Sequence, residues 1–201
     1  MEEARTITER LRALGMLFYP LGSNFEEAYQ AAKLSRPHAS LRRRLDCDVL
    51  TPGGYAHMLP VESLYRFWAD PKIYQPSHAA SFGAIKHHYL GDAALHMQYL
   101  YQRMQISIPE AFRAMPDHIT LQTELAALYA QANNIPALVT FVTDHFYWLN
   151  DYAVEIDERL ALLEEAGTKE VRTTELKAAL THLRELVDQV ISEVTFIENT
   201  L

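Results

Sequence analysis

The chain has 201 residues, of which 49% are hydrophobic and 22% charged, a composition typical of one globular domain with a large core. Its formal net charge of −8 disfavours nucleic acid and anionic lipid as partners. The single cysteine, Cys47, excludes an internal disulfide framework.

The N-terminal sequence lacks the basic start and apolar stretch of a secretory signal. No apolar run approaches the length that spans a bilayer. Together with the cysteine content, these features predict a cytoplasmic protein without stable membrane insertion.

Apolar residues recur along the chain with the 3.6-residue period of helices, and clear strand-length alternation is absent, which predicts an all-α protein. The first expected helix covers residues 3–19, and the second covers 24–34 with Asn24 as its N-cap. The predicted buried face of the first helix holds Ile7, Leu11, Leu14 and Phe18.

A basic segment at 39–50 contains the run Arg42-Arg43-Arg44. We expect this run to form a solvated face with ion pairs to nearby acids. Cys47 lies between Asp46 and Asp48, whose negative charges would disfavour a reactive thiolate.

The Pro-Gly-Gly sequence within 51–55 predicts a turn. Helices are expected over 77–90 and 92–106. Gly91 is placed at the end of the first of these two helices, and Asp92 as the cap of the second.

The next expected helix covers 117–132. Pro116 disfavours helical backbone before it, and Asp117 is a favourable N-cap residue. His118 then falls in the first turn, where the positive end of the helix dipole would lower its pKa.

Asn134 starts a further helix, with Pro136 in its first turn, and the absence of proline and glycine from 137 to 166 predicts that it is continuous until Gly167. A final amphipathic helix is expected over about 170–198. With no repeat and no linker, the chain is predicted to be a single domain, 1–201, a helical bundle of about 8–10 helices.

His88, Asp92 and His96 recur at four-residue spacing, and imidazole and carboxylate groups can bind zinc or iron. The helix break expected at Gly91 would separate them. The sequence signatures of zinc proteases, phosphate-binding loops and serine hydrolases are absent. We therefore predict neither a metal site nor a catalytic set.

Three segments place polar groups among large apolar residues: 59–68, 114–128 and 141–152. Within them, Pro60-Val61-Glu62-Ser63-Leu64-Tyr65, Pro116-Asp117-His118-Ile119 and Phe141…His145-Phe146-Tyr147-Trp148 follow in order. In that order and spacing they resemble the TorD/DmsD/NarJ family of redox-enzyme maturation chaperones.

The resemblance implies an all-α, single-domain, TorD-like chaperone without enzymatic activity. Such proteins bind the twin-arginine leader or the apo form of a molybdenum oxidoreductase catalytic subunit. They assist insertion of its molybdopterin guanine dinucleotide cofactor and release the subunit for export or membrane assembly. No resident cofactor is implied beyond the weak guanine-nucleotide binding proposed for some members. We expect a monomer or a homodimer.

A receptor for a basic and apolar leader needs carboxylates beside an apolar wall. Glu62, Asp117 and Glu124 are the candidate carboxylates, and Leu64, Tyr65 and Trp68 the candidate wall. His118 could donate to a peptide carbonyl. The full candidate peptide-binding set is Pro60, Glu62, Ser63, Leu64, Tyr65, Trp68, Pro116, Asp117, His118 and Glu124, with His145 and Trp148 as secondary candidates.

Two alternatives stay open at this point. One is a helical metal-dependent hydrolase that uses the pairs Asp117-His118 and Asp144-His145, which elemental analysis would test. The other is a structural helical adaptor without a groove, in which changes at 60–65 and 117–118 alter only stability.

Overall fold

The computed structural model describes residues 2–19, 25–66, 89–167 and 171–201. These residues are mainly helical and include no strand, so the predicted all-α, single-domain fold is confirmed. No helix within the described ranges is both long enough and apolar enough to cross a bilayer.

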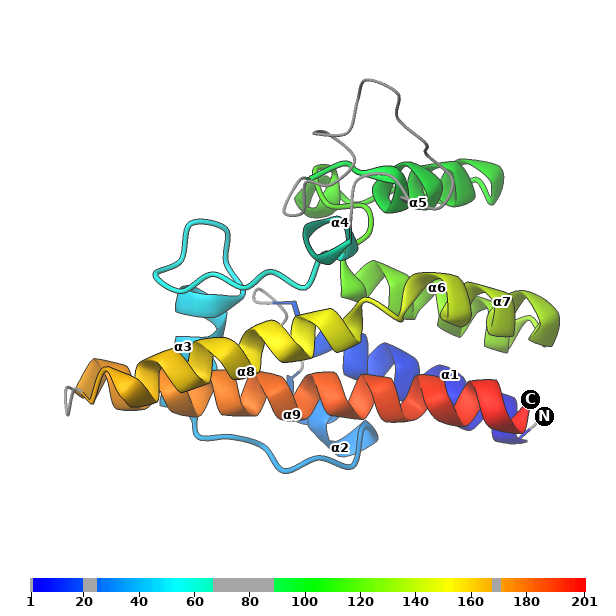
Figure 1. Ribbon diagram of the computed structural model, residues 1–201. Helices are drawn as coiled ribbons and strands as arrows, with labels where there is room; N and C mark the ends of the chain where they lie inside the picture. The colour runs from blue at the N-terminus through cyan, green and yellow to red at the C-terminus, as the bar shows by residue number, and fades with distance from the viewer. Residues whose placement is uncertain (1, 20–24, 67–88, 168–170) are drawn as a thin grey trace, which may run out of the picture.

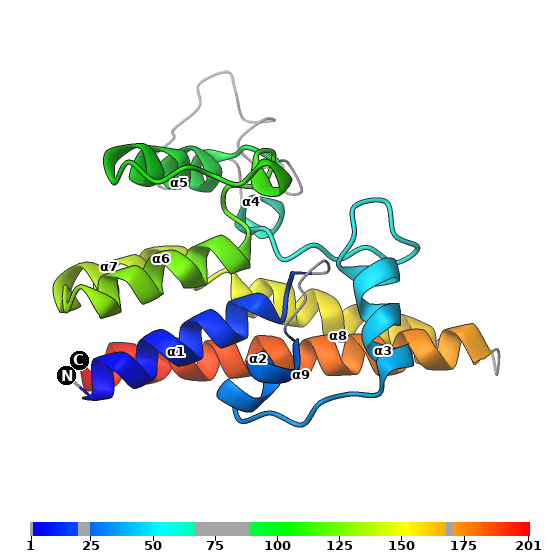
Figure 2. The same ribbon diagram turned by 180° about the vertical axis from the view of Figure 1, so that it is seen from behind.

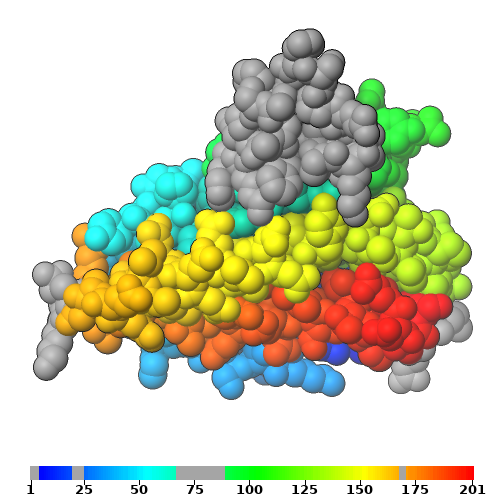
Figure 3. All heavy atoms as spheres, in the orientation of Figure 1, coloured from blue at the N-terminus to red at the C-terminus, as the bar shows by residue number. Residues whose placement is uncertain are grey.

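The long C-terminal helix α9 (Val171–Thr200) is the axis of the bundle. Helix α8 (Leu149–Glu165) packs along it, and Figure 3 shows the two lying together across one face. On the opposite side, Figure 2 shows α1 (Glu2–Met16), α2 (Phe25–Ala31) and α3 (Ala39–Arg44). A π-helix over Leu45–Val49 directly follows α3.

Helices α6 (Ile119–Gln131) and α7 (Ile135–His145) lie side by side, α6 against α1 and α7 against α9. Figure 1 shows α5 (Asp92–Arg103) beyond them, on the side away from α9. The four-residue α4 (Glu62–Tyr65) contacts both α5 and α8. A 3₁₀ turn over Glu110–Phe112 precedes α6.

The core forms where the apolar stripes meet. All four residues of the predicted α1 face are buried: Ile7, Leu11, Leu14 and Phe18. Trp148 and Tyr152 are among the largest fully buried side chains. Burial of each such large apolar side chain contributes about 1.5–3 kcal/mol, so helix packing, rather than helix propensity alone, stabilises the bundle.

Several predicted boundaries are confirmed, but the predicted cap of α5 is wrong. The turn at 51–55 is present, and Gly167 ends α8 with a positive φ of 60°. Helix α5 begins at Asp92, but its N-cap is Gly91, which has extended backbone and no side-chain cap. Asp92 is already helical and lies in the first turn, where its carboxylate interacts favourably with the positive end of the helix dipole.

Two predicted helix ends lie outside the described residues: the cap Asn24 and residues 77–88 of the helix expected over 77–90. Residues 89 and 90, at the end of that range, form a turn. The helix expected over 24–34 is present as α2, although it is shorter.

Gly15 allows α1 to approach α6 closely. Thr120 Oγ1 donates to the carbonyl of Gly15 at 2.9 Å. A Cβ atom at Gly15 would meet Thr123 Oγ1 at 1.9 Å. That hydroxyl is itself held by a hydrogen bond to the Ile119 carbonyl at 2.9 Å, so it has little freedom to move.

We expect Gly15→Ala to lower the free energy of unfolding by about 1–3 kcal/mol, because overpacking outweighs the gain in helix propensity. Urea denaturation would measure the loss. Thr123→Ala removes the clashing hydroxyl. Gly15→Ala should therefore cost less stability when it is added to Thr123→Ala than when it is added to wild type. Gly15→Ala at wild-type stability would contradict the close approach.

Candidate functional site

Two of the three motif segments are joined through their backbones. Ile119 N–H donates to the Pro60 carbonyl at 2.9 Å, and Glu62 N–H donates to the Asp117 carbonyl at 3.2 Å. Between these bonds, Val61 and His118 form an isolated antiparallel bridge. The start of α4 is therefore fixed against the start of α6, although the two are more than fifty residues apart.

Asp117 caps a different helix from the one predicted. Its Oδ2 accepts from Ser63 N–H at 2.6 Å and from the Ser63 hydroxyl, so it caps the first turn of α4. The N-cap of α6 is His118, whose Nδ1 accepts from Thr120 N–H at 3.2 Å. The predictions of Asp117 as the α6 cap and of His118 within the first turn were wrong. Pairing with α4 turns the aspartate away from its own helix.

Burial changes the acidity of both residues. The pKa of His118 is lowered to about 3 because its ring is enclosed without an opposing charge. The pKa of Asp117 is raised, first by burial and also by the nearby Glu62 carboxylate, although the bonds from Ser63 act against the rise. Among the described residues, Asp117 Oδ1 has no hydrogen-bond partner.

Glu62 is the centre of a buried polar cluster, which we call the Glu62 node. Its side chain has no exposed surface. Oε2 accepts from His145 Nδ1 at 2.8 Å and from the Gln122 amide, while Oε1 accepts from Arg66. Gln122 also accepts from Trp148 Nε1 at 3.3 Å, which fixes the orientation of its amide.

His145 extends the node towards the surface. Its Nε2 lies 2.8 Å from Nδ1 of the exposed His96 on α5. This contact joins the two rings, and which nitrogen donates depends on the tautomer of each ring. The pKa of His96 is lowered, first because protein atoms exclude water from part of its ring and then by the neighbouring His145.

The third segment contains a helix break that the sequence did not predict. The continuous helix expected over 136–166 is interrupted between α7 and α8. Trp148 Nε1 donates to the His145 carbonyl at 2.8 Å. In a continuous helix that carbonyl would accept from Leu149 N–H, which instead donates to Phe146 at 3.1 Å. The break turns the Trp148 indole into the core.

The predicted apolar wall also faces inward. Leu64 and Tyr65 are buried, and the Tyr65 ring lies 5.5 Å from Trp148 and 4.6 Å from Tyr152. Pro60, Ser63 and Pro116 are buried as well. Trp68 lies outside the described residues. The motif side chains thus form an internal junction rather than an open groove.

Glu124 does not belong to this junction. Its half-exposed carboxylate pairs with Arg12 of α1 at 3.0 Å. Glu124 was predicted to be one of three carboxylates in a groove, but α6 directs its side chain towards α1. It therefore stabilises the α1–α6 contact instead of adding charge beside Glu62.

A surface groove of about 520 Å³ lies next to the node, between α5 and α7. Leu100, Tyr129 and Phe141 supply apolar surface, and Asp144 supplies an exposed carboxylate. His96 and His145 also line the groove, so the node reaches solvent there. This is the accessible part of the candidate site.

Five residues of the site were not among the predicted set: His96, Gln122, Arg66, Asp144 and Tyr147. Gln122 had a detectable signal, because it follows His118 by four residues on a helix face that is otherwise apolar. His96 was considered only as a metal ligand. Arg66 follows Glu62 by four residues, the spacing of a helical ion pair, so this pair also had a local signal. Tyr147 reaches Arg66 only through folding, and no local pattern marks that contact.

The side chains of the two Asp-His pairs turn to different partners. In each pair the side chains separate: Asp117 turns to Ser63, while Asp144 is exposed and His145 turns to Glu62. Within the described ranges, no three His, Cys, Asp or Glu side chains are grouped to hold a metal ion. His88, a member of the spaced triplet, lies outside those ranges.

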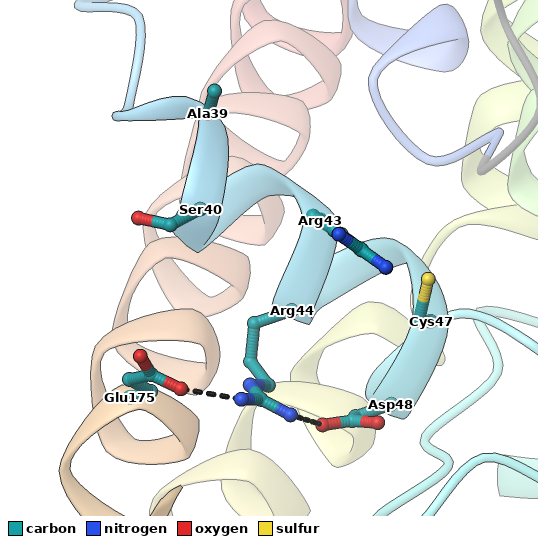
Figure 4. A pocket seen from close by; sticks show the side chains of 7 residues that line it. All are labelled: Ala39, Ser40, Arg43, Arg44, Cys47, Asp48 and Glu175. Carbon is teal, nitrogen blue, oxygen red and sulfur yellow. Dashed lines mark hydrogen bonds and ion pairs between the residues drawn. The ribbon is translucent and has the colours of Figure 1, made fainter. Parts of the chain in front are cut away.

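A second pocket, of about 600 Å³, lies between α3, the π-helix and the start of α9 (Figure 4). Arg44 lies between Asp48 and Glu175 and pairs with both, and Arg42 pairs with Asp46 at 2.7 Å. The predicted ion pairs of the arginine run are therefore present, but Arg42 is buried instead of solvated. The pocket is lined by Ala39, Ser40, Arg43, Arg44, Cys47, Asp48 and Glu175.

The chain was compared with protein-family models, with curated protein sequences and with solved structures. None of the three comparisons finds a match. The resemblance to the maturation chaperones therefore rests on the three motif segments of the sequence.

Proposed function

We propose that the protein is a cytoplasmic chaperone that binds the twin-arginine leader, or the apo form, of a molybdenum oxidoreductase catalytic subunit. The observation that carries the proposal is the meeting of the three motif segments around Glu62. Ser63 and Asp117 are 54 residues apart in the chain, and Glu62 and His145 are 83 residues apart. The contacts between these segments give a physical reason for their order and spacing in the sequence.

The groove beside the junction suits the chemistry of a leader peptide. A twin-arginine leader presents guanidinium groups followed by an apolar stretch. The Asp144 carboxylate can pair with a guanidinium, and Leu100, Tyr129 and Phe141 can cover apolar side chains. The net charge of −8 adds long-range attraction for a basic segment.

In this proposal the buried motif residues act indirectly. Glu62 and His145 hold α4, α5 and α7 together, and so set the shape of the groove. Asp144 and the apolar groove residues contact the peptide directly. The molybdenum cofactor belongs to the client subunit, and the chaperone supplies no catalytic step.

Calorimetry with a panel of arginine-pair leader peptides tests the proposal. We expect micromolar or tighter binding to at least one leader, weakening as salt rises. Asp144→Asn should weaken that binding about tenfold, the effect of losing one charge-assisted contact. Glu124→Gln removes a carboxylate outside the groove and is the matched control.

Two results would count against the proposal in different ways. If no leader binds more tightly than the same peptide with both arginines replaced by glutamine, leader recognition is excluded. If leaders bind but Asp144→Asn and wild type have equal affinity, the groove is the wrong place for the arginine pair.

A further inference from the structure

The Arg66 guanidinium is held by groups from two distant parts of the chain. It donates to the Glu62 carboxylate and, from Nη1, to the Asp144 carbonyl at 3.4 Å. Its central carbon lies 4.3 Å from the centroid of the Tyr147 ring. We call these three groups, the Glu62 carboxylate, the Asp144 carbonyl and the Tyr147 ring face, the guanidinium cradle.

Each part of the cradle suits a guanidinium group. A carboxylate gives a charge-assisted hydrogen bond, a carbonyl accepts a further N–H, and an aromatic face attracts the planar cation. The carboxylate is also held in place from behind, because Gln122 and His145 bind its other oxygen. An arriving guanidinium would meet a site that is already ordered.

The Arg66 side chain is less enclosed than the carboxylate to which it donates. It follows the four-residue α4, with extended backbone at φ −96° and ψ 156°. Its side chain is 28% exposed, whereas that of Glu62 is 0% exposed. The cradle is fixed to α4 and to the α7–α8 junction, so the guanidinium can leave while the groups around it stay in place.

We infer that the guanidinium cradle is an arginine-binding site that the protein's own Arg66 occupies when no client is bound. One arginine of the client displaces Arg66 and takes its position. The identity of the incoming arginine rests on the proposed function, but the binding of a guanidinium does not. Asp144 links the two sites, since its carbonyl belongs to the cradle and its side chain lines the groove.

Self-occupancy lowers the apparent affinity of the site. A ligand binds only the fraction of molecules in which Arg66 has left, so the apparent Kd rises by the inverse of that fraction. Removing Arg66 should therefore tighten the binding of any guanidinium compound. A simple buried ion pair predicts the opposite, that the Arg66 variant is only damaged.

The test uses Arg66→Ala and methylguanidinium, with no leader present. At ten times its Kd, methylguanidinium should raise the Tm of Arg66→Ala by about 3–6 °C and that of wild type much less. Neutral methylurea, of similar shape, is the ligand control. Arg66→Ala combined with Glu62→Gln lacks the carboxylate and should lose the response.

If Arg66→Ala does not fold, Arg66→Gln retains a donor for Glu62 and takes its place. An equal response to methylguanidinium and methylurea, or an equal response in wild type and variant, overturns the cradle. In a second measurement, the Arg66 variant should bind an arginine-pair leader about tenfold more tightly than wild type. If methylguanidinium raises the Tm of Arg66→Ala but no leader binds, only the proposed function is rejected. If a leader binds but methylguanidinium does not raise that Tm, only the cradle is rejected.

Discussion

Replacing Glu62 with alanine is expected to lower the free energy of unfolding by about 3–5 kcal/mol, the usual cost of removing one partner from a buried charged cluster. The variant leaves buried donors on His145 and Gln122 without their acceptor. The guanidinium of Arg66 also loses its carboxylate. Urea denaturation with an unchanged m value would measure the loss.

Glu124→Ala is the matched control for this variant. Its carboxylate is 46% exposed and pairs with Arg12, an arrangement worth no more than about 1 kcal/mol. Glu62→Gln keeps the side-chain shape and should fall between the two. If Glu62→Ala were as stable as Glu124→Ala, the node would not be what holds α4 to α7.

Acidification should destabilise the protein through His118. The unfolded chain binds a proton at this residue below pH 6.5, but the folded protein does so only below about pH 3. Because the unfolded state binds more protons in that window, stability is lost as pH falls, by about 1.4 kcal/mol per unit. Between pH 7 and 5 the loss assigned to His118 is about 2 kcal/mol.

His118→Asn isolates this contribution, since asparagine can also serve as an N-cap. Urea denaturation at pH 7 and pH 5 should show a smaller loss in the variant than in wild type. Asp117 acts in the opposite sense. Because its pKa is raised in the folded protein, the folded state takes up this proton before the unfolded state does as pH falls, and the folded state is favoured. Replacing the exposed His57 gives a matched control, and equal losses in wild type and His118→Asn would contradict the burial argument.

The helices were predictable because a buried stripe is a local pattern. The period that predicted α1 requires only residues a few positions apart, and its four predicted core residues are buried. The break between α7 and α8 was not predictable in this way. At the break the Trp148 indole donates to the His145 carbonyl, and the segment contains no proline or glycine to mark it.

The members of the junction were predicted better than their surroundings. Glu62, Asp117, His118, His145 and Trp148 were all named, and the fold brings them together. Their burial was not predicted, because an isolated carboxylate or imidazole in a sequence is expected to face water. Only the distant partners supplied by folding make it favourable to bury them.

The pairing of α1 with α6 has a consequence for synthesis of the chain. Arg12 and Glu124, which join the two helices, are 112 residues apart. At about 5–20 residues per second, a ribosome needs roughly 6–22 s to add that length. During this delay the apolar face of α1 has no native partner on α6, so the nascent chain must avoid aggregation before its own core can close.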